Sequence, residues 1–308
     1  MSGDIILHHY PQSPVSEKVR CVLGIKDLSW RSVIIPRMPP KPDLVELTGG
    51  YRLTPVMQIG ADIFCDTQAI IRELERIKPE PTLFPGGSHG MAWAVGRWTD
   101  VELFKTVTKV VFGDAGKDLP KDFSKDRGAL YFGADYNLKA LIKALPENLV
   151  QLRAQIEWID ERLAARDFML GAEPGLPDAL CYYNIWFIRG RYSKGPAFLK
   201  KFKRLCAWEN RVKAIGHGRP KDMDASYAHA VARGATSLVT QGGDGDDLCG
   251  INPGDEVTVE STGVTGCPAV QGRTLRISSQ EIVIQRHGGI VGNVAVHFPR
   301  AGYLVKKV

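Results

Sequence analysis

Tyr10-Pro11-Gln12-Ser13-Pro14-Val15-Ser16-Glu17-Lys18-Val19-Arg20 is the stretch that decides how the first part of this chain folds. It follows a short apolar run at residues 5–7, and beyond it apolar residues recur with helical spacing, at Val15, Val19, Val22 and Leu23. This pattern predicts a strand, a turn and then a helix. Ser13 stands where an N-cap hydroxyl belongs, and Pro14 stands at the first helical position, where its missing N–H costs nothing.

Ser13 is the residue of this stretch that can carry chemistry. Helix N-termini leave backbone N–H groups unpaired and carry partial positive charge. A hydroxyl presented there can hydrogen-bond an anion such as a thiolate. The alternative is that Ser13 only caps its helix. The local pattern alone leaves both interpretations open.

The size and composition of the chain indicate a globular protein with two or three domains. It has 308 residues, of which 44% are apolar and 24% charged, and a formal net charge of +6. We expect no membrane helix, because no apolar run reaches the roughly 18 residues that such a helix needs. We also expect no secretory signal, because the N-terminus lacks a charged segment followed by a long apolar core.

The cysteines are scattered, without a C-x-x-C pair or a Cys/His cluster of zinc spacing. There are six, at Cys21, Cys65, Cys181, Cys206, Cys249 and Cys267. This distribution favours reduced thiols in a cytoplasmic protein and predicts no metal site. His8 and His9 are adjacent, but neighbouring residues of a strand face opposite sides, so they cannot both point into one site.

Residues 1–78 are predicted to form a first domain with the order β-α-β-α-β-β-α. Alternation and apolar runs place strands at 5–9, 30–35, 56–59 and 63–65, the last two as a hairpin, and helices at 14–26, at 43–47 and from Asp66 or Thr67 onward. Residues 78–90 are rich in proline and glycine. We therefore expect a linker and a domain boundary there.

The rest of the chain changes character twice. Apolar residues recur with helical spacing throughout residues 91–236, which predicts an all-helical second domain. Residues 241–247 are predicted to be a flexible connector. In residues 251–308 the period changes to two, which predicts four to five short strands and a small antiparallel β-barrel domain. A domain that small is near the lower limit for standing alone.

Two further features of the first domain suit a peptide ligand. Thr54-Pro55-Val56 places a proline before a strand, and a cis bond there would let the Thr54 N–H and C=O pair with an extended peptide. The alternative is an ordinary trans proline that opens an edge strand. Asp66-Thr67 begins a helix, where it could hold a ligand carboxylate and ammonium. The alternative there is a plain N-cap pair.

Taken in order, these motifs make the first domain resemble the thioredoxin-like domain of the glutathione S-transferases. The helical domain is similar to the second domain of that family, so the resemblance covers about residues 3–236. It rests on Ser13-Pro14-Val15-Ser16-Glu17-Lys18-Val19-Arg20, Leu53-Thr54-Pro55-Val56 and Asp66-Thr67-Gln68-Ala69-Ile70. Where the family usually has an S/T-x-x-D capping box in its second domain, this sequence has Gly175-Leu176-Pro177-Asp178. We interpret this departure as a structural variant, since glycine also serves as an N-cap.

The resemblance implies a function for each motif. Ser13 would stabilise the thiolate of glutathione, with Tyr10 as the alternative because some classes of the family use a tyrosine. Thr54, Pro55 and Val56 would bind the cysteinyl backbone, and Asp66 with Thr67 the γ-glutamyl end. Lowering a thiol pKa by two units needs about 2.7 kcal/mol. One hydrogen bond to a charged group supplies about 1.5–3 kcal/mol and a helix N-terminus about 0.3–1 kcal/mol.

The resemblance also implies a glutathione transferase that acts on small electrophiles in detoxification, as a cytoplasmic homodimer without nucleic-acid or membrane partners. Trp93, Trp98 and Phe104 could line the electrophile pocket, or they could be core residues at helical spacing. The alternatives are a glutathione-dependent lyase, isomerase or dehalogenase, or a non-enzymatic scaffold whose C-terminal barrel binds a partner. Residues 189–219 are strongly basic, which indicates either a solvated helix face or a surface for an anionic partner.

Overall fold

The computed structural model describes residues 3–243 and 247–308 and divides into two compact units, each treated by itself below. A sheet unit contains the described residues of Met1–Ser16, Leu28–Arg76 and Arg219–Val308. A helical unit contains Glu17–Asp27 and Ile77–Gly218. The division passes through the first helix, after its first turn.

The N-terminal elements follow the predicted β-α-β-α-β-β-α order and form a thioredoxin-like arrangement, as predicted. They are β1 (Ile6–His9), α1 (Pro14–Ile25), β2 (Ser29–Ile34), α2 (Pro42–Thr48), β3 (Val56–Ile59), β4 (Asp62–Cys65) and α3 (Thr67–Ile77). β1 is parallel to β2 and antiparallel to β3, and β3 forms the predicted hairpin with β4. β1 is buried at every residue, as expected of a central strand.

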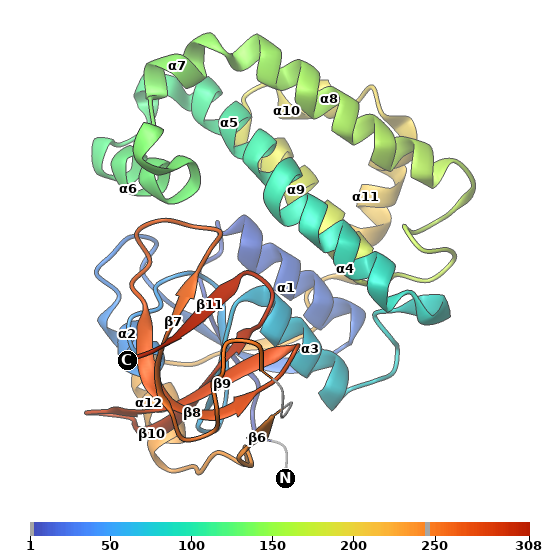
Figure 1. The fold of residues 1–308 in the computed structure, drawn as a ribbon. Coiled ribbons are helices and arrows are strands. Elements are labelled where there is room, and N and C mark those ends of the chain that lie inside the picture. The colour runs from blue at the N-terminus through green and yellow to red at the C-terminus, as the bar shows by residue number, and fades with distance from the viewer. Residues whose placement is uncertain (1–2, 244–246) are drawn as a thin grey trace. The chain divides into compact units, whose positions relative to one another are not determined.

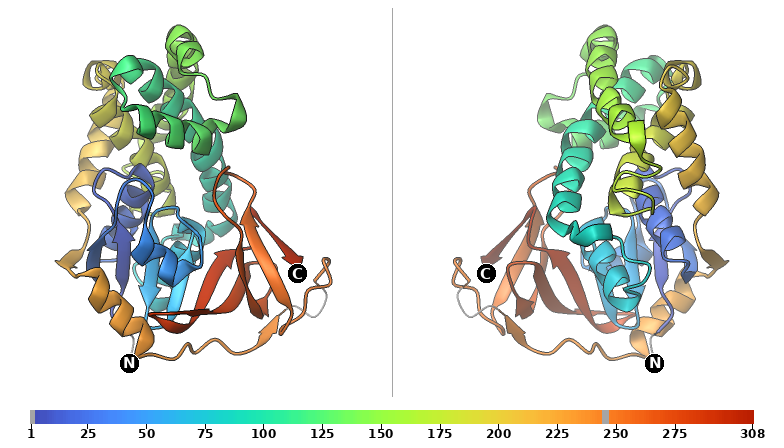
Figure 2. Two further views of the ribbon diagram at one scale, coloured as in Figure 1. Left: turned by 90° about the vertical axis from the view of Figure 1, so that its left-hand side faces the viewer. Right: turned by 90° about the vertical axis from the view of Figure 1, so that its right-hand side faces the viewer.

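Residues 247–308, which we call the C-terminal extension, add five strands to this sheet. They are β7 (Glu256–Ser261), β8 (Val270–Ile277), β9 (Glu281–Gly288), β10 (Gly292–Pro299) and β11 (Tyr303–Lys307). They pair antiparallel with one another, and β10 also pairs in parallel with β4, where Ala295 lies opposite Asp62. The strand order is therefore β11-β7-β8-β9-β10-β4-β3-β1-β2-β5. Figures 1 and 2 show the strands of the extension, in orange to red, beside the blue N-terminal elements.

The strands of the extension are antiparallel as predicted, but their closure into a separate barrel is not seen. Within residues 247–308, β11 pairs only with β7, and β10 pairs with β9 on one side and β4 on the other. The physical reason is the composition of β10, whose residues 294–299 are all buried. A strand that is apolar on both faces is stable inside a sheet and not at an edge.

One hydrophobic core runs through both parts of the sheet unit. Ile6, Val56 and Ile63 from the thioredoxin-like part belong to the same cluster as Val296 and Phe298 from the extension. Each fully buried side chain of this size contributes about 1.5–3 kcal/mol. The extension is therefore held by the same core as the thioredoxin-like part.

Residues 219–236 were predicted to be helical throughout and to close the helical domain, and this prediction is wrong in part. β5 (Arg219–Asp222) is a strand that pairs in parallel with β2. The predicted last helix is present as α12 (Ala225–Arg233), which packs in the sheet unit on β2, α2 and β10. β6 (Gly242–Gly243) pairs with β8. Residues 244–246 of the predicted connector lie outside the described residues.

The helical unit contains the predicted all-helical segment as far as Gly218. Its helices are α4 (His89–Arg97), α5 (Phe104–Ala115), α6 (Lys121–Phe132), α7 (Leu138–Lys143), α8 (Leu145–Arg162), α9 (Leu176–Arg191), α10 (Gly195–Leu199) and α11 (Lys203–Ile215) (Figure 1). α9 is buried along most of its length, as its apolar sequence predicts. Over residues 3–243 and 247–308, none of the helices combines the length and the apolar character needed to span a membrane.

The variant capping box of α9 works through its carboxylate. The Gly175 N–H donates to Asp178 Oδ2 at 2.9 Å, and the Met169 N–H and the Trp208 indole N–H donate to Asp178 Oδ1 at 2.9 and 2.7 Å. Burial raises the pKa of Asp178 to about 6, although these donors act to lower it. The interpretation of Gly175 and Asp178 as a structural variant of the capping box is confirmed.

Candidate functional site

The three predicted motifs meet at one end of the sheet. Val56, the first residue of β3, lies opposite His8 near the end of β1 and opposite Cys65 at the end of β4. Tyr10 and Ser13 follow β1, Thr54 and Pro55 precede β3, and Asp66 and Thr67 follow β4. Because neighbouring strands end together, residues far apart in the sequence come to the same edge.

Ser13 caps α1 as predicted. Its Oγ accepts the Ser16 N–H at 3.1 Å, and its own N–H donates to the Tyr10 carbonyl at 3.1 Å. Only 2% of Ser13 is exposed. A hydroxyl oxygen that accepts one hydrogen bond can still donate its hydrogen to another group. The cap geometry is therefore compatible with both interpretations of Ser13.

Lys41 supports the Thr54–Pro55 segment, whose peptide bond is cis. The Lys41 ammonium donates to the Arg52 carbonyl at 3.1 Å and to Thr54 Oγ1 at 2.9 Å, although only 3% of Lys41 is exposed. It also lies 5.7 Å from the centre of the Tyr10 ring. Sequence reasoning missed Lys41, because a lysine in a proline-rich loop carries no sign of its partners.

Asp66 has a partner from the distant end of the chain. Its Oδ1 accepts the Gln68 N–H at 2.9 Å, which is a helix-start interaction, and its Oδ2 accepts the Tyr303 hydroxyl at 3.2 Å. Its backbone φ is +76°, and Thr67 beside it is buried. No local pattern pointed to Tyr303, which lies in β11. The carboxylate predicted to hold a ligand ammonium is thus shared with the extension.

Comparison with known proteins identifies the family. The sequence model described as the glutathione S-transferase N-terminal domain matches residues 7–82. The crystal structure of a GST-like protein from Pseudomonas syringae is 32% identical and covers 99% of this chain and 100% of its own, with a TM-score of 0.83. This chain belongs to the glutathione S-transferase-like family. The match to the Pseudomonas syringae protein includes the C-terminal extension.

Other members of the family match only part of this chain. The FtsZ-localized protein A of Caulobacter vibrioides is 25% identical over 192 residues, which are 58% of this chain and 74% of that protein. Poplar glutathione transferase F1 is 14% identical, with a TM-score of 0.52 over 69% of this chain and 96% of its own, and shows the fold alone. Neither of these two matches spans the whole of this chain.

The aromatic residues predicted for an electrophile pocket lie in the helical unit and have different partners. Trp93 packs against Phe84, with ring centres 5.9 Å apart. The Trp98 indole donates to Gln155 Oε1 at 3.1 Å. Phe104 packs edge-on against Tyr131 at 5.5 Å. Their part in an electrophile pocket stays a prediction.

The charged residues of the opening stretch form buried ion pairs in the helical unit. Lys18 lies 2.8 Å from Asp100, which also accepts the Tyr183 hydroxyl at 2.9 Å. Arg20 donates to Glu17 at 2.7 Å. Burial would raise the pKa of Glu17, but the hydrogen bond from His217 and the charge of Arg20 lower it overall. These ion pairs hold the part of α1 from Glu17 onward in the helical unit.

Glu17, Cys21 and His217 bring three possible metal ligands within 4.8 Å of one another, a group that their positions in the sequence did not suggest. Two features oppose a cation. Arg20 already balances the Glu17 charge, and burial raises the pKa of Cys21 well above its ordinary value. A thiol must lose its proton to bind a metal. We therefore assign no metal to this group.

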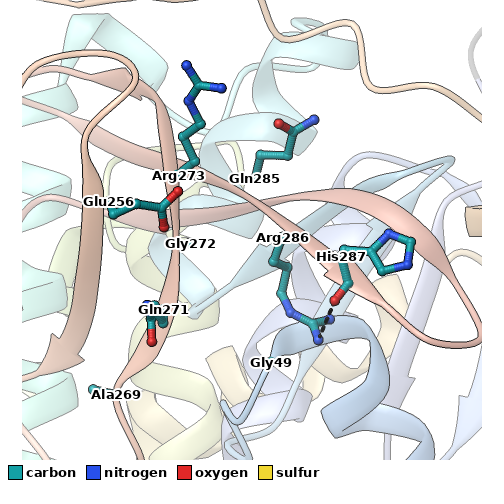
Figure 3. A pocket seen from close by; sticks show the side chains of 9 residues that line it. All are labelled: Gly49, Glu256, Ala269, Gln271, Gly272, Arg273, Gln285, Arg286 and His287. Carbon is teal, nitrogen blue, oxygen red and sulfur yellow. Dashed lines mark hydrogen bonds between the residues drawn. The ribbon is translucent and has the colours of Figure 1, made fainter. Parts of the chain in front are cut away.

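A polar hollow of about 460 Å³ lies on the extension, beside the end of α2 (Figure 3). Its lining includes Glu256, Arg273, Arg286 and His287. Arg286 donates to the Glu46 carbonyl and so caps α2, whose carbonyls lack helical partners there. The predicted site residues do not line this hollow, which is a separate feature of the extension.

Proposed function

We propose that this chain binds glutathione at the end of the sheet and activates its thiol for attack on a small electrophile, as a glutathione transferase. One observation carries the proposal. Ser13 at the start of α1, Thr54 before β3 and Asp66 after β4 lie at the same edge of one sheet. The chain belongs to the GST-like family, whose reference activity is of this kind.

In this proposal Ser13 donates a hydrogen bond to the glutathione thiolate, and the N-terminus of α1 adds partial positive charge. Together they supply about 2–4 kcal/mol, which meets the 2.7 kcal/mol needed to lower the thiol pKa by about two units. Tyr10 remains the alternative donor. Burial does not decide between them, because Ser13 is 2% exposed and Tyr10 is 8% exposed.

The peptide part of glutathione would bind to the two other motifs. The Thr54 backbone, at the start of the strand with Pro55 and Val56, would pair with the cysteinyl residue. Asp66 would accept the γ-glutamyl ammonium and the Thr67 end of α3 its carboxylate. Lys41 places a buried positive charge beside Thr54, which suits the carboxylate at the other end of the peptide.

The test is the Ser13→Ala variant in a conjugation assay with a chromogenic electrophile. We expect turnover to fall about 10- to 100-fold, which is the loss of one hydrogen bond to a charged group. Glutathione affinity, measured by calorimetry, should change much less. Tyr10→Phe is the matched variant and should keep its activity. Unchanged turnover of Ser13→Ala together with loss in Tyr10→Phe would move the role to Tyr10.

Two other functions use the same site or replace it. A lyase, isomerase or dehalogenase would differ in substrate alone, and product analysis over a substrate panel separates it from a transferase. A protein-binding scaffold is favoured by the similarity to FtsZ-localized protein A. A scaffold should fail to bind glutathione resin and should co-sediment with FtsZ polymers. The cytoplasmic location, the homodimer and the role in detoxification stay predictions.

A further inference from the structure

The C-terminal extension contacts one residue of the candidate site and two residues close to it in the sequence. The Tyr303 hydroxyl donates to Asp66 Oδ2 at 3.2 Å. The Gln68 amide donates to the Ala301 carbonyl at 3.3 Å. The Arg52 guanidinium donates to the Gly266 carbonyl at 2.8 Å. The Arg52 contact joins the extension to the segment that precedes Thr54 and β3. The Gln68 and Asp66 contacts join it to the segment that follows β4.

Cys267 lies beside the same segment. The main-chain N–H groups of Arg52 and Leu53 face its sulfur and lower the pKa of the thiol, but burial, the larger effect, raises the pKa above its ordinary value. Cys267 packs against the core together with Leu53. A glycine–cysteine pair, Gly266-Cys267, therefore lies along the segment that leads into Thr54 and Pro55.

Most of the extension is fixed in place. β10 pairs with β4 over Ala295, Val296 and His297, and the Ile290 N–H donates to Glu46 of α2. The parts that touch the candidate site are the loop between β7 and β8, residues 262–269, and the start of β11. A ligand could therefore displace the loop without unfolding the sheet.

We propose that this loop, together with Tyr303 at the start of β11, is an internal occupant of the peptide-binding half of the site, so that glutathione competes with both for it. The inference rests on the proposed function. Gly266-Cys267 offers a carbonyl and a thiol, as the cysteinyl-glycine part of glutathione does. The Tyr303 hydroxyl donates to the Asp66 carboxylate, which a γ-glutamyl ammonium would also use as its acceptor. Closing the loop lowers the apparent affinity in proportion to the closed fraction.

The first test measures the exposure of Cys267. S-methylglutathione is used as the probe, because it has no thiol to exchange, and iodoacetamide labelling of the whole chain is followed by peptide mass spectrometry. We expect a saturating probe to raise the labelling rate of Cys267 at least fivefold. Cys206, which is also partly buried but belongs to the helical unit, is the internal control and should not change. An unchanged or slower rate at Cys267 overturns the inference.

The second test weakens two contacts of the extension one at a time, that of Tyr303 in β11 and that of Cys267 in the loop. Tyr303→Phe keeps the ring and removes the donor to Asp66, and Cys267→Ala removes the sulfur. Each should tighten the Kd for S-methylglutathione about three- to tenfold by calorimetry. Tyr227→Phe and Cys249→Ala, at exposed positions of the same unit, are the matched controls.

The outcomes separate the inference from the proposed function. Tighter binding by Tyr303→Phe and Cys267→Ala supports both. Equal or weaker binding by these two variants, with measurable binding by the native chain, overturns the internal occupant and leaves glutathione binding in place. If neither the native chain nor any variant binds the probe, both proposals are wrong.

Discussion

The thioredoxin-like part and the C-terminal extension share one sheet but differ in how far their strands are exposed to solvent. β1 and the last six residues of β10 are buried throughout, whereas β11 alternates between buried and exposed residues. An alternating strand has one face on a core and one in water, while a continuously buried strand needs neighbours on both sides. The extension therefore has an inner strand fused to the thioredoxin-like core and outer strands with an exposed face.

Removal of the extension should have the largest effect on the stability of the sheet unit. A chain that ends at residue 250 loses β7–β11, which leaves the β4 edge unpaired and uncovers its apolar neighbours. An unpaired apolar edge promotes aggregation. We expect loss of the cooperative thermal transition and of the near-ultraviolet circular dichroism of the sheet unit. A truncated chain that melts like the full chain would show that the extension is an accessory.

A control shortens the chain without reaching the core. Removing Lys307 and Val308 takes away the exposed end of β11 and leaves Tyr303 and Val305 in place. We expect its melting temperature to change by a few degrees at most, since surface changes cost about 0.5 kcal/mol or less.

The second prediction compares two core residues on either side of the β4–β10 pairing. Phe298 in the extension packs against Tyr51 and Tyr303, and Ile63 in β4 is fully buried in the same cluster. Phe298→Ala should lower the free energy of unfolding by about 3–5 kcal/mol and Ile63→Ala by about 2–5 kcal/mol. Urea unfolding should show both losses in one shared transition. A separate, early transition in Phe298→Ala alone would mean that the extension unfolds independently.

His297 makes the same pairing depend on pH. It lies between Asp62 Oδ1 at 2.9 Å and Glu281 Oε1 at 2.8 Å, stacked on Phe64. Burial would lower the pKa of His297, but the hydrogen bonds and charges of the two carboxylates raise it overall. A raised histidine pKa contributes stability that is complete below the unfolded value of about 6.5 and is lost as pH rises through the folded pKa.

The free energy of unfolding should therefore fall as the pH rises above 6.5 and through the raised pKa of His297. His297→Gln should remove this dependence, while His287→Gln, at an exposed position, should keep it. His8 does not contribute to the change above pH 6.5. Burial lowers the pKa of His8 to about 4, so its protonation destabilises the fold only at acid pH. A flat profile in the native chain would contradict the bridging role of His297.

The sequence predicted the local structure of both parts, but it predicted their pairing only in the thioredoxin-like part. The strand and helix order through α3 follows from changes of period and from caps such as Ser13-Pro14, which are local signals. The strands of the extension were also predicted from their period. Their partner was not, because an apolar strand such as β10 can either close a small barrel or join another sheet. β5 was not predicted, because its four residues are exposed and show no apolar periodicity.

The residues of the candidate site also fall into those that local sequence patterns predict and those that depend on contacts across the fold. Ser13, Thr54 and Asp66 were predicted because each lies next to the start of a strand or helix. Turn and cap residues can be recognised from the local sequence alone. Lys41 and Tyr303 were missed because their roles depend on contacts across the fold. Tyr303 lies 237 positions from Asp66, and no local pattern encodes such a contact. The contribution of the extension to the site therefore became visible only with the structure.

Among the substitutions compared for stability, Asp66→Asn should have the smallest effect, and it separates the two uses of this residue. Asparagine retains an oxygen for the Gln68 N–H or the Tyr303 hydroxyl but has no charge for a ligand ammonium. We expect unfolding to become easier by about 1 kcal/mol or less, the net value of one hydrogen bond at a partly exposed site. Glutathione affinity should fall about tenfold, because a hydrogen bond to an ammonium is worth about 1.5 kcal/mol or more. Calorimetry beside urea unfolding measures both. Unaltered affinity would assign Asp66 to the extension alone, and a loss of stability as large as that of Phe298→Ala would make its contact with Tyr303 a main support of the sheet.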